Sequence, residues 1–177
     1  MPAHAARQAL LARCQRRQAV TALGVTGHQA IPPEIRSSTV EAVRDIFRRV
    51  GSPLLGVTSL AAGADQLVAI ELVRNGGQLH VIVPCRNYER TFTSTEGLAC
   101  FRSLLEAAHD VTTLDYSEPS EEAFMAAGKT IVDRCEMLLA IWDGRPARGL
   151  GGTADVVAYA RSSGKAVNIV WPDHTGP

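Results

Sequence analysis

The chain lacks several features that would assign it to a functional class at once. Eighteen basic residues balance eighteen acidic ones, so the net charge is zero and the bulk charge gives no sign of a nucleic-acid or membrane-surface partner. No apolar run approaches the roughly 20 residues of a transmembrane helix. Neither a Walker A motif nor GxGxxG after the first apolar run is present, which disfavours an NAD-dependent dehydrogenase. We therefore expect no nucleic-acid partner, no membrane partner and no cofactor.

Cysteine pairs with metal-binding spacing are also missing. The four cysteines, Cys14, Cys85, Cys100 and Cys135, form no CxxC motif, and no histidine stands at ligand spacing from them. Each lies in or beside an apolar segment, which is typical of reduced core cysteines. We therefore expect no metal site and a reducing, cytoplasmic location.

Acidic residues are absent from the first eighteen positions, which contain four arginines. A transit peptide has this composition, but sixteen arginines against two lysines in the whole chain make arginine excess a general habit of this sequence. We interpret residues 1–18 as an amphipathic or frayed leader and residues 173–177 as a tail.

What the chain does have is a regular alternation of two kinds of segment. Short apolar runs cover residues 19–26, 54–59, 79–84, 110–114, 137–142 and 166–170, and segments with helical spacing cover 33–50, 63–75, 95–108, 120–134 and 152–163. Pro32 and Pro33 open the first helix, and Gly51 closes it. Apolar strands that alternate with helices indicate a parallel sheet covered on both faces. We predict a single α/β domain over residues 19–172, a doubly wound, three-layer Rossmann-like sandwich.

Ligands of such folds bind in the loops that follow the carboxyl ends of the strands. The loop after the first strand contains Thr26, Gly27 and His28. A small hydroxyl and a glycine let backbone N–H groups approach an anion, to which His28 could donate a hydrogen bond. The alternative is an ordinary glycine turn.

The loop after the second strand contains Ser59, Gly63 and Asp65. Ser59 ends the strand and Gly63 provides the turn. An aspartate in the first turn of a helix is favourable to the helix dipole without any ligand. Asp65 is therefore either a structural residue or a ribose-binding one.

The loop after the third strand begins at Pro84. Arg86 and Arg90 could pair with a phosphate, and Tyr88 offers a face on which a base could stack. The alternative is a solvated loop whose one aromatic side chain is tucked into the core.

The loop after the fifth strand is the richest in glycine. Asp143 and Gly144 end the strand, and the sequence "GLGGT" then leads into a helix with Gly151, Gly152 and Thr153. Glycines remove the Cβ that would block a phosphate, and a helix start supplies unpaired N–H donors. Thr153 acts either as the N-cap or as a hydroxyl donor to an anion. Three glycines in four positions favour the phosphate-binding interpretation.

Taken in order, these motifs resemble the SLOG superfamily. "GVTGH", "SLAAGAD", "VIVP" with a following tyrosine, and "CEMLLAIWDG" followed by "GLGGTADVVAYA" are similar to the Rossmann-like group that includes the LOG enzymes and DNA processing protein A. The resemblance covers about residues 19–172. It implies a site for a nucleotide or nucleotide derivative, with the phosphate at Gly151, Gly152 and Thr153, and Gly63 and Asp65 across the cleft. It also implies a homodimer.

The chain departs from both branches of the superfamily. LOG enzymes cleave the N-glycosidic bond of nucleoside 5′-monophosphates with an arginine and a glutamate. The glutamate falls at Val156 here, with Asp155 one place earlier, and the arginine falls at about Gly128. The arginine that DNA processing proteins carry in the "SLAAGAD" turn is Ala62. We therefore place binding of a nucleotide-derived small molecule first, and a LOG-type hydrolase second with Asp155 as its weak catalytic candidate. A single-strand binder comes last.

Overall fold

The six apolar runs form the strands of one parallel sheet. The computed structural model describes residues 20–146 and 149–172, so the predicted leader and tail, with Cys14, lie outside the described residues. The strands are β1 (Thr21–Gly27), β2 (Leu54–Thr58), β3 (Gln78–Val83), β4 (Asp110–Thr113), β5 (Met137–Ile141) and β6 (Ala166–Val170). Their order in the sheet is β4-β3-β2-β1-β5-β6, and every neighbouring pair is parallel. The predicted α/β, Rossmann-like fold class is confirmed.

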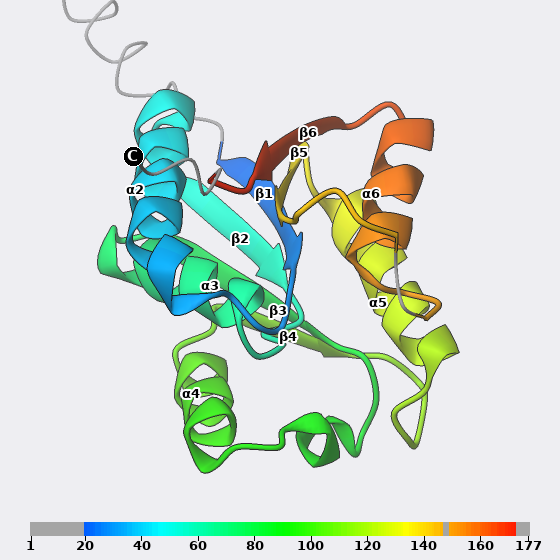
Figure 1. Cartoon of the computed structure of the whole chain (residues 1–177). Helices are drawn as coiled ribbons and strands as arrows, with labels where there is room; N and C mark the ends of the chain where they lie inside the picture. The colour runs from blue at the N-terminus through cyan, green and yellow to red at the C-terminus, as the bar shows by residue number, and fades with distance from the viewer. Residues whose placement is uncertain (1–19, 147–148, 173–177) are drawn as a thin grey trace, which may run out of the picture.

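Helices follow the strands along the chain and cover both faces of the sheet (Figure 1). They are α2 (Pro33–Val50), α3 (Ala64–Arg74), α4 (Thr95–Glu106), α5 (Glu121–Arg134) and α6 (Thr153–Ser162), with a 3₁₀ helix η1 (Tyr88–Thr91) before α4. As predicted, Pro33 stands at the first helical position of α2 and Gly51 caps its end, at φ 85°.

Alternation along each strand divides the core between the two faces. In β5, Leu138 packs with the apolar residues of α5 and α6, whereas Leu139 packs with those of α2, α3 and α4. Both leucines are fully buried. A strand buried on both faces must be apolar at every position, which is why the runs are continuous rather than alternating.

The strand order locates the point at which ligands bind in this kind of fold. From β1 in the middle of the sheet the chain builds outward to β4 at one edge, and it then returns to add β5 and β6 on the other side of β1. The order therefore reverses between β1 and β5. In folds of this kind ligands bind at such a reversal, outside the carboxyl ends of the strands.

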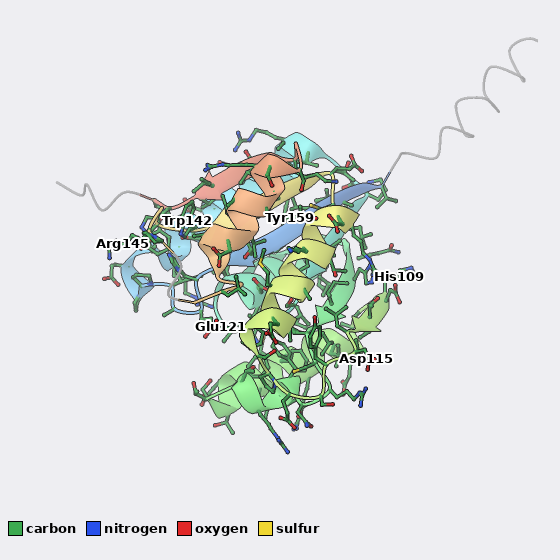
Figure 2. All side chains as sticks on the ribbon, turned by 90° about the vertical axis from the view of Figure 1, so that its right-hand side faces the viewer. His109, Asp115, Glu121, Trp142, Arg145 and Tyr159 are labelled. Atoms are coloured by element: carbon green, nitrogen blue, oxygen red, sulfur yellow. The ribbon has the colours of Figure 1, made fainter. Side chains whose placement is uncertain are left out.

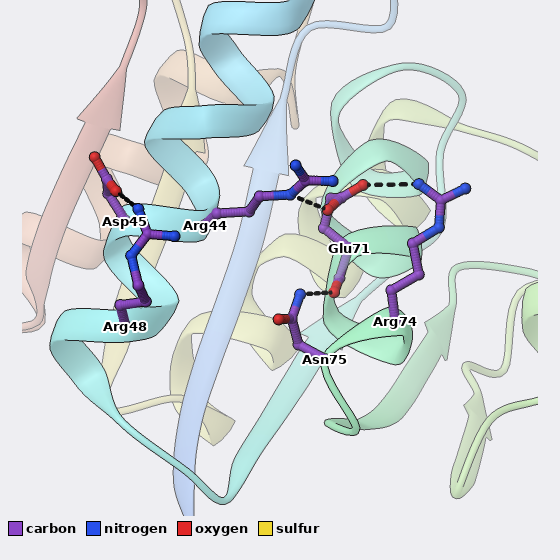
Figure 3. A network of polar contacts seen from close by, with 6 residues as sticks. All are labelled: Arg44, Asp45, Arg48, Glu71, Arg74 and Asn75. Atoms are coloured by element: carbon purple, nitrogen blue, oxygen red, sulfur yellow. Dashed lines mark hydrogen bonds and ion pairs between the residues drawn. The ribbon is translucent and has the colours of Figure 1, made fainter.

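A polar network ties α2 to α3 (Figure 3). The buried Glu71 carboxylate accepts hydrogen bonds from Arg44 at 2.7 Å and from Arg74 at 3.0 Å, and Asn75 bonds the Glu71 carbonyl. The Arg44 guanidinium holds the pKa of Glu71 below its usual range. None of these residues lines the cleft described below, so we assign the network to the fold.

Cys85, Cys100 and Cys135 are free thiols; the first and last are buried, and Cys100 is partly buried. Within residues 20–146 and 149–172, no helix has the length and apolar character needed to cross a bilayer.

Candidate functional site

A cleft of about 1030 Å³ opens at the carboxyl ends of the strands. Its volume is at the upper end of small-molecule sites, which run from roughly 300 to 1,000 Å³. The structure brings eleven of the predicted ligand-binding residues to its lining: Thr26, Gly27, His28, Ser59, Asp65, Pro84, Tyr88, Asp143, Gly151, Gly152 and Thr153. Gly63, Gly144 and Asp155 do not line it.

The loops after β1 and β5 meet through a histidine and an aspartate. His28 Nε2 lies 2.9 Å from Asp143 Oδ1. The backbone N–H of Arg145 donates to the same oxygen at 3.0 Å, and it is the main cause that lowers the pKa of Asp143. The Nε2 of His28 is thus already engaged, which leaves Nδ1 as the ring nitrogen for contact with a ligand.

Gly27 is explained by packing rather than by an anion. A Cβ at this position would lie 2.5 Å from the Ala64 Cβ and 2.6 Å from the Ile141 carbonyl oxygen. The amide that follows is also occupied, because the His28 N–H donates to the Ile141 carbonyl at 3.0 Å. α3 and β5 therefore exclude a side chain at this position, whereas contact of the loop with an anion stays a prediction.

Asp65 holds the turn between β2 and α3. Its Oδ2 accepts hydrogen bonds from the Thr58 hydroxyl at 2.9 Å and from the Ala61 amide at 3.4 Å. Burial raises the pKa of Asp65 to about 7, against the opposing effect of these two hydrogen bonds. Asp65 therefore has the structural role that its position allows, and because it also lines the cleft, its contact with a ribose stays a prediction.

Gly63 belongs to the same turn, but it packs against the loop after β1 and does not line the cleft. Its φ of 85° is in the left-handed region, and a Cβ would lie 2.3 Å from the Gln29 carbonyl oxygen. The Ala64 amide donates to the His28 carbonyl at 3.0 Å, so this turn is fixed against the loop after β1. Gly63 therefore affects the cleft indirectly, by fixing the turn that carries Asp65.

The two glycines before α6 differ in their surroundings. Gly151 has a φ of 82°, and a Cβ there would lie 2.6 Å from the backbone nitrogen of Met125 in α5. Gly152 is the N-cap of α6 with φ −72° and ψ 171°, a conformation open to any residue. Asp155 turns back and accepts from the Gly151 N–H at 3.0 Å. The carboxylate therefore fixes the loop instead of facing the cleft.

Thr153 is the first residue of α6, not its cap. Its hydroxyl has no hydrogen-bond partner among the described residues, although Thr153 lines the cleft. The amides of Thr153 and Ala154 likewise find no backbone acceptor within those residues. This group of donors at the start of a helix is suited to an anion.

Tyr88 does not present a free face for stacking. It is 5% exposed, and its ring packs edge-on against Phe92, Phe101 and Phe124. Burial raises its pKa. The structure therefore matches the alternative interpretation, an aromatic side chain tucked into the core. The arginines of this loop also point elsewhere, since they pair with Asp115 and Glu118 at the surface.

The cleft also contains residues that the motifs did not indicate. Trp142 follows β5, Trp171 follows β6, and Glu121 begins α5. A Cβ at Gly149 would lie 2.5 Å from Glu121 Oε1, so this carboxylate lies against the glycine loop. The strand-end rule could have found both tryptophans, whereas Glu121 carries no signal that distinguishes it from any acid in a first helical turn.

The two positions that the family resemblance matches to the LOG arginine and glutamate are in contact with each other. Gly128 in α5 and Val156 in α6 both line the cleft, and a Cβ at Gly128 would lie 2.5 Å from Val156 Cγ2. They pack the two helices together at the floor of the cleft. Among the described residues, no group of three or more histidine, cysteine or acidic side chains could hold a metal ion.

Three solved structures have the same fold as this chain. DNA processing protein A from Streptococcus pneumoniae matches with a TM-score of 0.66 and 18% identity over 88% of this chain, which spans 52% of that protein. DNA processing protein A from Helicobacter pylori matches with a TM-score of 0.63 and 12% identity. The match covers 88% of this chain and 67% of that protein. The protein TM1055 matches with a TM-score of 0.54 and 16% identity, over 84% of this chain and 72% of its own. No protein-family model matches the chain, and no curated protein matches it in sequence.

These matches confirm the predicted α/β, Rossmann-like fold. They also correct one prediction about partners. The H. pylori structure is described by its mode of binding single-stranded DNA. The expectation of no nucleic-acid partner is therefore wrong, because the composition of the chain does not exclude such a partner. Its physical flaw is that net charge sums the whole surface, whereas a single strand contacts one local groove and its aromatic platforms.

Proposed function

We propose that this chain, which has the fold of the SLOG superfamily, binds a nucleotide or nucleotide-derived small molecule in the cleft at the carboxyl ends of its strands. The ligand's phosphate contacts the start of α6. There, Gly152 leaves room for the anion, and Thr153 supplies a hydroxyl and a backbone N–H. The observation that carries the proposal is that these donors face the cleft without partners among the described residues.

The charge on the cleft favours a ligand that brings hydroxyl groups as well as a phosphate. Among the described residues, the acidic side chains of Asp65, Glu121 and Asp143 line it together with the guanidinium of Arg145. Arg145 Nε lies 3.5 Å from Asp143 Oδ2 and is shared with that carboxylate. Carboxylates accept hydrogen bonds from ribose hydroxyls, as the dinucleotide-binding folds illustrate. A ribose phosphate supplies both kinds of group.

The hydrolase alternative is disfavoured by the floor of the cleft. Hydrolysis in the LOG manner would need an arginine and a glutamate where Gly128 and Val156 pack together. Asp155, the displaced candidate, is bound to the Gly151 N–H. The loss of a positioned acid or base typically lowers a rate by about 10² to 10⁴. Binding without turnover is the activity that these residues support.

A thermal-shift screen tests the binding proposal. Nucleoside monophosphates, ADP-ribose derivatives and dinucleotides should be compared with a single-stranded oligonucleotide at matched phosphate concentration. We expect at least one mononucleotide-type compound to raise the melting temperature in proportion to the logarithm of its concentration. Stabilisation by the oligonucleotide alone would assign the cleft to a nucleic-acid strand instead.

Turnover is tested by incubating each stabilising compound with the protein and measuring release of the free base. We expect the compounds to survive, and Asp155→Ala to make no difference. Release at about 1 per second or faster would show a competent enzyme and contradict the proposal. Loss of such release in Asp155→Ala would identify the displaced carboxylate as its catalyst.

A further inference from the structure

Three aromatic rings follow the carboxyl ends of three adjacent strands. His28 comes after β1, Trp142 after β5 and Trp171 after β6, and these strands are consecutive in the sheet. All three side chains line the cleft. Among the described residues that line the cleft, the other rings belong to the cluster around Tyr88, whose members pack against one another. The rings therefore stand at the point where the strand order reverses.

The orientation of each ring is fixed by a neighbour. Trp142 Nε1 donates to the Arg145 carbonyl at 2.8 Å, and Figure 2 shows these two residues together beyond the end of β5. The ring centroids of Trp171 and His28 are 5.1 Å apart, and the angle between the ring planes is 80°. Neither indole is fully buried, unlike Tyr88. Each indole also packs against the hydrophobic core, Trp142 on the α5 and α6 side and Trp171 on the α2 and α3 side. Both rings are thus held before any ligand arrives, and their exposed part offers apolar contact at a low entropic cost.

We propose that Trp142 and Trp171 form the platform on which the base of the ligand stacks. This inference rests on the proposed function, because it concerns the same cleft, and it narrows the ligand to a compound with an exposed planar heteroaromatic ring. The bases of nucleotides all present such a face, so stacking supplies affinity without selecting one base. Tyr88, which the sequence suggested for this role, is replaced by the two tryptophans.

Fluorescence gives a direct test, because the chain has only two tryptophans and both line the cleft. AMP and ribose 5-phosphate are the probes, since they share the phosphate and ribose and differ in the base. We expect AMP to change the indole emission on titration and ribose 5-phosphate to leave it unchanged. Calorimetry on the same samples reports binding independently of the indoles.

Substitutions separate the platform from the phosphate site. Trp142→Ala and Trp171→Ala should each weaken AMP about five- to hundredfold, the range for the loss of one stacking ring, and change ribose 5-phosphate by less than about twofold. The Phe variants should keep most of the AMP affinity because they keep a planar ring, and they serve if the Ala variants do not fold. Tyr116→Ala, an exposed aromatic outside the cleft, is the matched control.

The outcomes distinguish the two proposals. If AMP binds by calorimetry while the emission and the four tryptophan variants show no effect, the platform is wrong and the phosphate site stands. If the Ala variants weaken ribose 5-phosphate as strongly as AMP, the indoles shape the site rather than stack on a base, which also overturns the platform. If neither probe binds, both proposals fail.

Discussion

At the scale of single residues, the glycines before α6 can be separated by their backbone geometry. Gly151→Ala should destabilise the protein by about 1–3 kcal/mol, because its φ of 82° and the close Met125 backbone both reject a side chain. Gly152 has φ −72° and ψ 171°, which any residue can adopt, so Gly152→Val causes no backbone strain and the fold should survive at a cost of at most about 1 kcal/mol for the changed cap. A valine there should nevertheless abolish nucleotide binding. Thermal melts and calorimetric titrations with AMP measure the two effects.

Thr153→Val is the milder companion to Gly152→Val. It keeps the shape of the side chain and removes one hydrogen bond to a charged group, worth roughly 1.5–3 kcal/mol. The affinity for AMP should fall about ten- to hundredfold. Because Thr153 is not the cap of α6, the melting temperature of the Thr153→Val variant should stay close to that of the wild type. A drop in stability with unchanged affinity would show that the loop serves the turn alone.

The buried Asp65 predicts a pH dependence of stability. Its pKa of about 7 in the folded protein lies above the ordinary value of 3.8, so between these values the folded state binds a proton that the unfolded state does not. The free energy of unfolding should therefore fall as the pH rises from about 4 to about 7, by up to a few kcal/mol. Asp65→Asn keeps the acceptor oxygen for Thr58 and should remove this fall.

Urea denaturation at several pH values measures the difference between wild type and Asp65→Asn. Asp115→Asn, which changes an exposed carboxylate, is the control for the other acids of the chain. Parallel pH profiles for wild type and Asp65→Asn would contradict the assignment of the proton to Asp65.

At the scale of elements, α5 and α6 pack so closely at Gly128 that a side chain there would collide with Val156. Gly128→Ala would place a methyl group 2.5 Å from Val156 Cγ2 and should cost about 1–3 kcal/mol. Val156→Ala removes the opposing methyl groups, so the double variant should cost less than the sum of the two single changes. A double-mutant cycle from urea unfolding measures this coupling; strict additivity would mean that the helices separate instead of clashing.

The elements themselves follow from the sequence, whereas the contacts between their loops do not. The run 137–142 predicts β5 (Met137–Ile141) to within a residue, because a strand buried on both faces must be apolar throughout. No periodicity says that Tyr88 turns into the core or that Thr58 bonds Asp65, since tertiary packing sets the direction of a loop side chain. The strand-end rule located the cleft, and the side chains within it required the structure.

At the scale of the whole molecule, zero net charge conceals an uneven distribution. Among the described residues, three acidic side chains and the Arg145 guanidinium line the cleft, while the donors that suit a phosphate are backbone groups and a hydroxyl at the start of α6. The amino-acid composition counts charged side chains but says nothing about how backbone N–H groups are oriented. It therefore gives no information about an anion site built from backbone donors. The homodimer implied by the family resemblance stays a prediction at this scale.

The location of the ligand phosphate tests the central claim most directly. A crystal structure of the protein, grown with a saturating concentration of the most stabilising nucleotide, would show it. We predict a phosphate oxygen about 2.7–3.2 Å from the Thr153 backbone nitrogen or hydroxyl, beside Gly152. A nucleotide bound with its phosphate away from the start of α6, or a cleft that stays empty at saturation, would contradict the account.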